Sequence, residues 1–285
     1  MALRLSPHLT VMANAAQKAS KRLLRDFAEV EQLQVSVKGP SDFVTQADIR
    51  AEQTLREELN KARPGYAFLM EESGASGSEN WAWRWIVDPL DGTTNFLHGI
   101  PHWCISIGLE RRLPDGGSEP VAGLIYAPAS DELFWAEKGT GAFVNERRLR
   151  VSARREIKDA VLATGIPFAA VASQRQLAFA RTLAALMPQV AGIRRFGAAA
   201  LDLAWVAAGR YDGYWELGIK PWDMAGGLLL VREAGGYATD PAGGDPREHG
   251  DMVAANPHLH ARLAAIVLEG RQSAATRSSH DGTFR

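Results

Sequence analysis

Two aspartates interrupt an apolar stretch near the middle of the chain's first half. Residues 85–99 read WIVDPLDGTTNFLHG, so Asp88 and Asp91 follow buried-looking residues and are separated by a proline and a leucine. Proline biases the residue before it toward extended backbone, which predicts that Asp88 ends a strand. Asp91 and Gly92 form a dipeptide typical of turns. A plain turn is one interpretation of this stretch, and a site for a metal ion and a phosphate is the other.

The residues after Asp91 could hold an anion. Gly92 has no side chain to keep a ligand away from the backbone amides, and Thr93, Thr94 and Asn95 can cap and open a short helix. The free N–H groups at the start of such a helix would point at an anion. Two carboxylates beside a bound anion repel it unless cations lie between them. Mg²⁺, which binds carboxylates, water and phosphate oxygens, would resolve that conflict.

Two further acidic positions fit the same chemistry. Glu71 and Glu72 directly follow an apolar segment, 66–70, and Asp223 stands in the first turn of an apolar, glycine-containing helix predicted over 222–236. Taken alone, the two glutamates also fit a solvated loop, and Asp223 fits a carboxylate favoured by the helix dipole. Because each of these charges adjoins a segment that should be buried, the set as a whole favours a metal site.

These residues need a scaffold, and the first half of the chain predicts two helices followed by strands. Apolar spacing predicts a helix over 7–30 and another over 41–65, the latter capped by Ser41 or Asp42 and ended by Pro64-Gly65. Alternating and β-branched runs separated by turn residues predict the strands. These strands are expected at 66–70, 83–88, 104–110, 120–128, 132–138 and 141–145.

After about residue 158 the pattern changes to alternating strands and helices. Strands are predicted at 160–166, 211–217, 236–240 and 251–256, and helices at 173–187, 198–209, 222–236 and 257–269. We expect a layered α/β protein forming one catalytic unit over 1–268, with an α+β half to residue 155 and an α/β half from 156. Residues 269–285 are polar and basic, which predicts a mobile tail.

Composition excludes several classes of protein. A chain of 285 residues with 46% hydrophobic residues can bury a sizeable core, and its net charge of -1 provides no general attraction to nucleic acid or anionic membranes. The single cysteine, Cys104, excludes an intramolecular disulfide and a cysteine zinc cluster. No apolar run is long enough to span a bilayer, and the N-terminus has no signal-peptide core. A reduced, cytoplasmic protein is the expectation.

Two other features have competing interpretations. Cys104 lies two residues from His102, so a nucleophilic pair is conceivable, although a buried core cysteine is favoured. The run ERRLRVSARREIK, residues 146–158, could bind RNA phosphates through its five arginines, or it could be a solvated sheet edge blunted by charge. The near-zero net charge favours the sheet edge.

Four motifs together carry a resemblance to a known family. VDPLDGTTNFLHGIP, the downstream PWDMAGGLLLVREAGG, and the upstream MEES and KGPSDFVTQAD resemble the inositol monophosphatase family, and most closely its bacterial branch that includes the extragenic suppressor proteins. The resemblance covers about residues 10–268. It implies an αβαβα five-layered sandwich and a Mg²⁺-dependent phosphatase, inhibited by lithium, that hydrolyses myo-inositol monophosphate. It also implies a homodimer and, from the suppressor branch, a contact with RNA polymerase or RNA.

The same resemblance implies a set of metal ligands. Glu71, Asp88 and the carbonyl of Leu90 would bind one Mg²⁺, and Asp88, Asp91 and Asp223 a second. A weaker third ion would lie near Glu71. Fructose 1,6-bisphosphate, histidinol phosphate and an adenosine bisphosphate remain alternative substrates for the same chemistry.

The catalytic residues implied are Glu71, Asp88 and Thr93. Thr93, paired with Glu71, would orient the attacking water, and the amides of Gly92 and Thr93 would hold the phosphate. A metal-activated water attacking in line requires no covalent intermediate, so no catalytic serine or cysteine is expected. Lys38 matches a position that lines the metal site in this family, as does Asp48.

The alcohol of the substrate would be recognised from several parts of the chain. The residues implied are Asp91, Asp223, Glu216 and the backbone from Gly197 to Ala199. This chain reads GAAALD where the family often has a hydroxyl residue after the glycine. Ala198 has no hydroxyl, so any substrate contact there is through the backbone alone.

Overall fold

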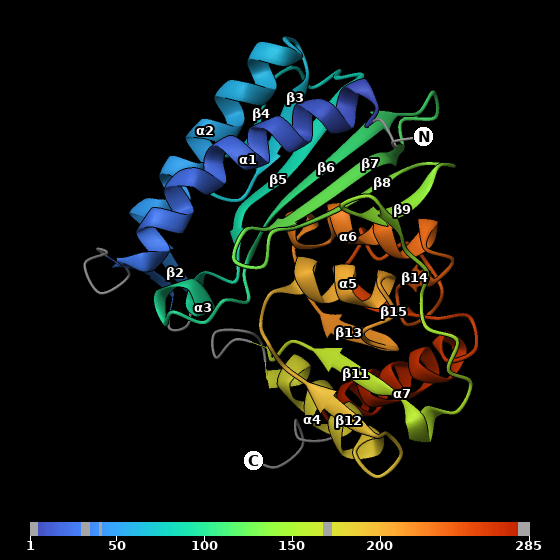
Figure 1. The fold of residues 1–285 in the computed structure, drawn as a ribbon. Helices are drawn as coiled ribbons and strands as arrows, with labels where there is room; N and C mark the ends of the chain where they lie inside the picture. Colours follow the sequence, from blue (N-terminus) through green and yellow to red (C-terminus); the bar gives the residue numbers. More distant parts are fainter. Residues whose placement is uncertain (1–4, 30–34, 40–41, 168–172, 279–285) are drawn as a thin grey trace.

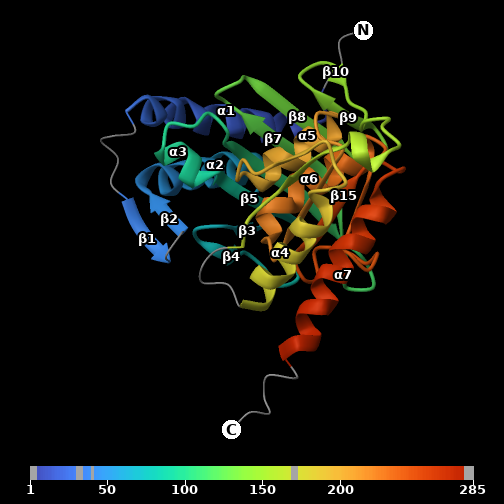
Figure 2. The same cartoon turned by 90° about the horizontal axis from the view of Figure 1, so that it is seen from below.

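The structure, a computed structural model of the chain, describes residues 5–29, 35–39, 42–167 and 173–278 (Figures 1 and 2). The larger of its two main sheets has the strand order β10-β9-β8-β7-β6-β5-β3-β4. Its strands are β3 (Ala67–Met70), β4 (Gly74–Ser76), β5 (Trp83–Asp91), β6 (Cys104–Arg112), β7 (Ser118–Ala127), β8 (Glu132–Glu137), β9 (Gly141–Val144) and β10 (Arg147–Arg148). Neighbouring strands are antiparallel except β3 and β5, which run parallel.

The second sheet has the order β12-β11-β13-β15-β14. Its strands are β11 (Val161–Thr164), β12 (Gly192–Arg194), β13 (Gly213–Leu217), β14 (Tyr237–Thr239) and β15 (Asp251–Ala255). β11 is parallel to both of its neighbours, whereas β15 is antiparallel to β13 and β14. The sheet is therefore mixed: its β11 pairs are parallel, as alternating strands and helices favour, and its β15 pairs are antiparallel.

Helices separate and cover the two sheets (Figure 1). α1 (Pro7–Ala28) and α2 (Gln46–Ala62) cover the outer face of the larger sheet, and α5 (Ala199–Ala207) and α6 (Pro221–Glu233) lie between the sheets. α4 (Ser173–Leu186) and α7 (His260–Ser278) cover the outer face of the smaller sheet. The layered α/β fold predicted from the sequence pattern and the αβαβα five-layered sandwich implied by the resemblance are confirmed. No helix within the described ranges combines the length and apolarity that crossing a membrane would take.

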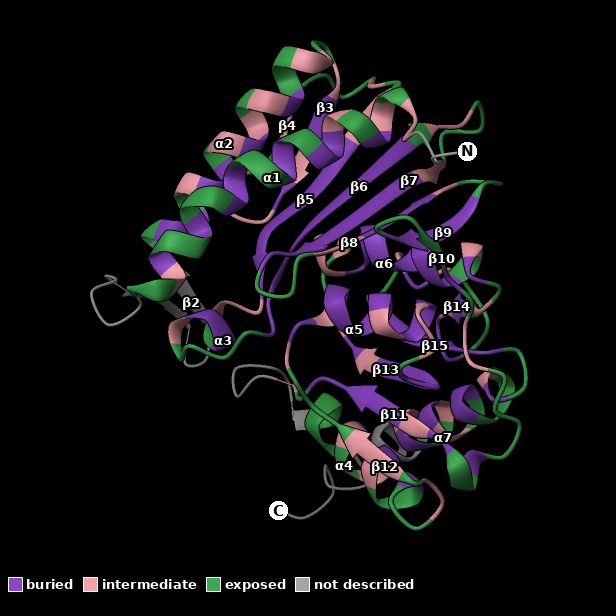
Figure 3. Cartoon of the chain, viewed as in Figure 1, coloured by how far each residue is buried: buried purple, intermediate pink, exposed green. Residues whose placement is uncertain are grey.

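Two glycines in the larger sheet let α6 lie close against it. A Cβ on Gly108 of β6 would lie 2.6 Å from the Cβ of Ala225, and one on Gly123 of β7 would lie 2.6 Å from the carbonyl oxygen of Gly226. Glycine at these positions permits a backbone approach that any larger residue would block. The close approach brings the first turn of α6, with Asp223, toward the strands that carry the other acidic residues. Figure 3 shows this central layer as almost entirely buried.

Side-chain alternation in β5 divides its residues between two layers. Trp85 and Val87 belong to the core under α1 and α2, whereas Arg84, Ile86 and Asp88 alternate with them and face the α6 side. Asp88 is therefore buried between the sheet and the central helices rather than in the outer core.

Three local predictions were wrong. The second helix begins at Gln46 and not at Ser41 or Asp42, because residues Asp42–Thr45 form strand β2 and pair antiparallel with β1 (Val35–Gly39). The aromatic and β-branched residues of FVT favour a strand over a helix start. Asp88 does not end its strand, since β5 continues to Asp91 with an irregular register against β6. Proline cannot donate a ladder hydrogen bond, which accounts for the irregularity.

The third error concerns the end of the chain. Helix α7 was expected to end at residue 269, but it continues to Ser278. Most of the segment predicted as a tail is therefore helical, and its final seven residues, 279–285, lie outside the described residues. Short strands β4, β10 and β12 were not predicted, because two or three residues carry too little periodicity to be recognised.

Candidate metal and phosphate site

Two acidic residues meet where the parallel strands β3 and β5 lie side by side. Met70 pairs with Val87, and the Glu71 N–H donates to the Val87 carbonyl at 3.2 Å, so Glu71 follows β3 directly beside Asp88. Asp88 is 2% exposed. Burial, the charge of Glu71 and the charges of two further aspartates raise its pKa well above the ordinary value. Each of these neighbouring carboxylates disfavours the charged form of Asp88, which acts in the same direction as its burial.

The turn after β5 has the form that only glycine adopts easily. Gly92 caps helix α3 (Thr93–Leu97) with φ 94° and ψ 33°, in the left-handed region. A Cβ at this position would lie 2.9 Å from the His102 carbonyl oxygen and 3.2 Å from the Ala198 Cβ. The Thr93 hydroxyl donates to the Leu90 carbonyl at 3.0 Å. The predicted short helix at Thr93 is confirmed, and its first amides are free of helix hydrogen bonds as in any helix.

Asp91 connects this turn to helix α5. Its Oδ2 accepts a hydrogen bond from the Ala200 N–H at 2.7 Å and lies 3.7 Å from the Cys104 Sγ. Burial raises the pKa of Asp91 to about 7, although the Ala200 amide opposes the shift. Two residues lead into this end of α5. Gly197 has a left-handed φ of 81°, and Ala198 is the N-terminal cap of the helix.

Asp223 joins the cluster from helix α6. Its Oδ2 accepts a hydrogen bond from the Lys220 N–H at 2.7 Å, so it caps its own helix as the dipole argument predicts. Burial and then the charge of Asp91 raise its pKa well above the ordinary value. Asp223 therefore both caps the start of α6 and lies close enough to Asp91 to be affected by its charge.

Glu216, at the end of β13, approaches the cluster from the smaller sheet. The Tyr214 hydroxyl donates to Glu216 Oε2 at 2.5 Å, and burial raises the pKa of Glu216 to about 7. A Cβ on Gly165 would lie 1.9 Å from Glu216 Oε1. Gly165 therefore makes room for this glutamate, a role that no sequence argument assigned to it. Its only signal was a glycine inside the strand predicted at 160–166.

The acidic residues influence one another through a low-dielectric interior. Burial is the largest cause of the raised pKa at Asp88, Asp91, Glu216 and Asp223, and the charges of neighbouring carboxylates come next or contribute further. Within the described residues, no three His, Cys, Asp or Glu side chains already stand in an arrangement that would hold a metal ion. Three aspartates each give one oxygen to a backbone amide, of Leu90, Ala200 or Lys220.

The donor set nevertheless fits a hard divalent cation. It consists of carboxylate oxygens and the Leu90 carbonyl, the ligand types that Mg²⁺ prefers. Several buried carboxylates beside one another are costly when ionised unless a cation balances them. Such a cluster of raised pKa values is also typical of functional sites.

Other predicted residues lie at or beyond the edge of this cluster. The Glu72 N–H donates to Glu52 Oε2 at 2.8 Å, and Asp48 is buried in the first turn of α2. The side chain of Lys38 lies outside the described residues. Burial raises the pKa of Cys104 well above the ordinary value, and His102 lies 3.4 Å from Asp202. Cys104 is thus a buried core thiol, as favoured, and not half of a nucleophilic pair.

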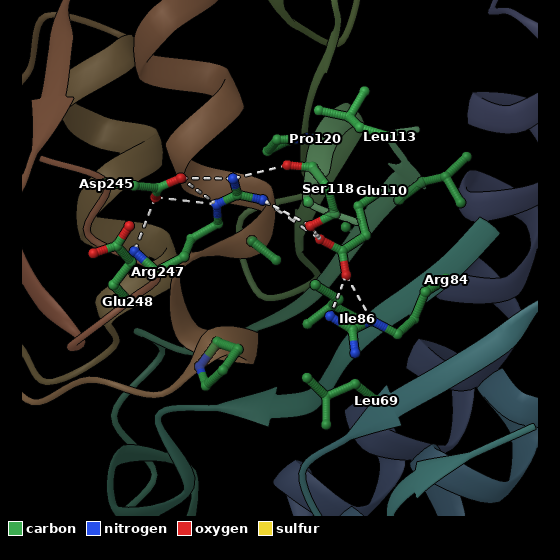
Figure 4. A pocket seen from close by; sticks show the side chains of 15 residues that line it. Leu69, Arg84, Ile86, Glu110, Leu113, Ser118, Pro120, Asp245, Arg247 and Glu248 are labelled. Atoms are coloured by element: carbon green, nitrogen blue, oxygen red, sulfur yellow. Dashed lines mark hydrogen bonds and ion pairs between the residues drawn. The ribbon is translucent and has the colours of Figure 1, made fainter. Parts of the chain in front are cut away.

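A cavity of about 430 Å³ lies next to the cluster, between α6 and the larger sheet (Figure 4). Leu69 and Ile86 line it, two residues before Glu71 and Asp88, and Pro221 of α6 lines it as well. Four of its charged side chains, Arg84, Glu110, Asp245 and Arg247, pair with one another. Arg84 Nε donates to Glu110 Oε1 at 2.5 Å, and Arg247 reaches Asp245 at 2.6 Å and the other Glu110 oxygen at 3.4 Å.

Comparison with known proteins gives a consistent result. The profile of the inositol monophosphatase family matches residues 5–272. The inositol-1-monophosphatase of Rhizobium meliloti is 54% identical over 260 residues, 91% of this chain and 95% of that protein. A Vibrio cholerae protein named Nus factor SuhB is 41% identical over 269 residues, 94% of this chain and 98% of that protein.

The fold matches solved structures equally well. The crystal structure of extragenic suppressor protein suhB from Bartonella henselae superposes with a TM-score of 0.86 at 52% identity, over 92% of this chain and 98% of that one. Fold, motifs and overall sequence therefore agree across nearly the whole length. The chain belongs to the inositol monophosphatase family.

Proposed function

We propose that this protein is a Mg²⁺-dependent phosphomonoesterase that hydrolyses myo-inositol monophosphate to inositol and phosphate. The observation that carries the proposal is the cluster of two buried aspartates, Asp88 and Asp91, with the half-buried Asp223 and Glu71, beside the left-handed turn at Gly92. Membership of the family and 54% identity to an inositol-1-monophosphatase support the substrate class.

The metal ligands we propose are those implied by the motifs. Glu71, Asp88 and the Leu90 carbonyl would hold one Mg²⁺, and Asp88, Asp91 and Asp223 the second; a third, weaker ion would lie near Glu71. Holding them requires the carboxylates to turn toward common points. When bound, the ions supply hydroxide character to a water at neutral pH and balance charge on the leaving oxygen.

The remaining residues orient the reactants. Because the Thr93 hydroxyl donates to Leu90, its oxygen lone pairs are free to accept from the attacking water, which Glu71 also faces in this proposal. The amides of Gly92 and Thr93 would hold phosphate oxygens, since no Cβ at Gly92 blocks them. Positioning and charge stabilisation suffice for phosphoryl transfer, so no nucleophilic side chain is needed.

The alcohol would be bound between the two sheets. Asp91, Asp223, Glu216 and the backbone of Gly197 and Ala199 would contact its hydroxyls. Ala198 is fully buried at the cap of α5 and has no hydroxyl, so the contact in this segment is with the backbone. Fructose 1,6-bisphosphate, histidinol phosphate and an adenosine bisphosphate are the alternative substrates.

Initial rates on this set of phosphate esters with Mg²⁺, with and without lithium, test the proposal. We expect the highest kcat/KM for inositol 1-phosphate, loss of activity in EDTA, and inhibition by lithium. A high rate on another ester with none on inositol 1-phosphate would refute the substrate while leaving the metal chemistry in place. Homodimer formation and a cytoplasmic location remain predictions, for which sedimentation and fractionation are the measurements.

A second candidate function rests on the exposed arginines at the edge of the larger sheet. Arg147 and Arg148 form edge strand β10, and Arg150, Arg154 and Arg155 follow it, all exposed. Relatives at 39–42% identity are named Nus factors. Neutralising Arg147, Arg148, Arg154 and Arg155 should abolish binding to RNA or RNA polymerase at physiological salt, whereas Asp91→Asn should not. Absence of any binding by the unaltered protein would remove this candidate.

A further inference from the structure

Asn95 connects two segments that belong to different halves of the protein. It lies in α3, 6% exposed, and its Nδ2 donates to the His102 carbonyl at 2.7 Å and to the Phe196 carbonyl at 2.7 Å. Residues 95 and 196 are 101 positions apart in the chain. Both hydrogens of one side-chain amide are therefore used to tie the loop after α3 and the segment before α5 to the same point.

A second contact closes the same connection. His102 Nε2 lies 3.4 Å from Asp202 Oδ1, in the first turn of α5. The His102 ring packs against the rings of Phe196 and Trp205, with centroids 4.9 Å and 5.1 Å apart. The loop that carries His102 therefore lies against α5 through these ring contacts and through the close approach of two buried side chains, His102 and Asp202.

These contacts lie around the turn at Gly92, which is the proposed phosphate-binding site. The His102 carbonyl oxygen that accepts the hydrogen bond from Asn95 also lies next to Gly92: a Cβ on Gly92 would be only 2.9 Å from it. The same Cβ would lie 3.2 Å from the Ala198 Cβ. Asp91, the residue before Gly92, accepts a hydrogen bond from the Ala200 amide at the start of α5. The separation between the turn at Gly92 and the segment 196–199 is thus set by Asn95, by His102 and by the packing between them.

We propose that Asn95 is a positioning residue that holds segment 196–199 at the distance from the Gly92 turn that a phosphorylated polyol spans. This inference rests on the proposed function, in which the turn binds the phosphate and the segment meets the alcohol. The two hydrogen bonds that the Asn95 side-chain amide donates end on the backbone carbonyls of His102 and Phe196, neither of which is a proposed metal ligand. Its effect is on substrates whose alcohol reaches segment 196–199.

The test compares two substrates on the Mg²⁺-loaded full chain. Inositol 1-phosphate contacts both the turn and the segment, whereas p-nitrophenyl phosphate has no polyol to place. For Asn95→Ala we expect KM for inositol 1-phosphate to rise about tenfold or more, while kcat/KM for p-nitrophenyl phosphate changes by less than about threefold. Asn95→Asp keeps the shape of the side chain, but an ionised carboxylate cannot donate a hydrogen bond to the two carbonyls. The same fall in the preference for inositol 1-phosphate over p-nitrophenyl phosphate is therefore expected.

Asn256 offers a matched control. It is fully buried and its Nδ2 also makes two hydrogen bonds, to Ser152 Oγ at 2.9 Å and to the Arg154 carbonyl at 3.0 Å. Asn256 Oδ1 also accepts from the His258 and Leu259 amides, so Asn256→Ala should lower the Tm at least as much as Asn95→Ala without changing the ratio of kcat/KM between the two substrates. A ratio that falls equally in both variants would show a general structural effect and overturn the inference, as would equal losses on both substrates in Asn95→Ala.

The outcome separates this inference from the proposed function. If the unaltered protein prefers a different phosphorylated alcohol, the substrate proposal fails. The test of Asn95 then uses the ratio of kcat/KM for that ester to kcat/KM for p-nitrophenyl phosphate. If Asn95→Ala does not fold, Asp202→Asn weakens the second contact only, and a smaller fall of the ratio, about two- to threefold, is expected. An unchanged ratio in Asp202→Asn together with an unchanged ratio in Asn95→Asp overturns the inference.

Discussion

Two groups of charged residues lie near helix α6, each with a deeply buried acid, and they differ in how their charges are matched. Asp88 and Glu110 are almost equally buried, at 2% and 3% exposed. Glu110 is paired with Arg84 and Arg247 and accepts a hydrogen bond from Ser118 (Figure 4). Asp88 instead lies beside other carboxyl groups.

The pKa values record the difference. At Asp245, in the paired group, burial raises the pKa, but the hydrogen bonds and charge of Arg247 outweigh it and leave the pKa below its ordinary value. At Asp88, burial and the neighbouring carboxylates act in the same direction. A buried acid whose charge is balanced by arginines needs no further partner, whereas buried acids that raise one another's pKa values are typical of functional sites and fit the proposed binding of a cation.

The largest expected effect comes from the unmatched group. Asp88→Asn keeps an oxygen to accept the Leu90 N–H but removes a charge that both proposed ions share. Losing about 4 kcal/mol of transition-state stabilisation would lower kcat about a thousandfold. Thermal unfolding in EDTA should show a Tm equal to or above that of the unaltered protein, since a repulsive charge is gone. Unchanged initial rates would refute the metal mechanism.

Next in size is the effect of Mg²⁺ and pH on stability. The folded-state pKa of Asp91 is raised from 3.8 to about 7, so its contribution to stability is complete below pH 4 and is lost as pH rises through 7. Without metal, Tm should therefore fall between pH 4 and pH 8. Mg²⁺ at one hundred times its Kd should add about 2.7 kcal/mol at pH 8.

Calorimetric scans with Mg²⁺ and with EDTA at pH 5.5 and 8 measure this. The Tm difference between the two conditions should widen at the higher pH, because Mg²⁺ binds the deprotonated carboxylates. A difference of the same size at both pH values would mean that these acids are not the ligands.

The smallest effect is expected in the matched group. Glu110→Gln removes the charge between Arg84 and Arg247, which are 27% and 24% exposed and therefore partly solvated. The free energy of unfolding should fall by about 1–3 kcal/mol, measured in urea. The kcat should stay within about twofold, since no proposed ligand is altered. A loss of activity as large as that of Asp88→Asn would erase the distinction between the two groups.

Features that depend on neighbouring residues were predictable. The turn at Gly92, the short helix from Thr93 and the place of Asp223 in the first turn of α6 all follow from backbone preferences over a few residues. The family and its layered fold followed from motifs far apart in the chain, and the comparisons confirm them. The roles of the site residues stay predictions until the variants above are measured.

Contacts between distant segments were decided by the tertiary structure. Nothing near Asn95 indicates that its amide reaches the Phe196 carbonyl, and nothing near Gly165 indicates that it makes room for Glu216. The Arg247–Glu110 pair joins residues 137 positions apart. The sequence by itself predicted most of the longer helices and strands and, through its motifs, the candidate residues of the site, because these depend on local hydrogen bonding and on the alternation of apolar residues. Only the packing of α5 and α6 between two sheets decided which acids lie beside one another and which lie beside arginines, because that depends on where distant side chains are brought together.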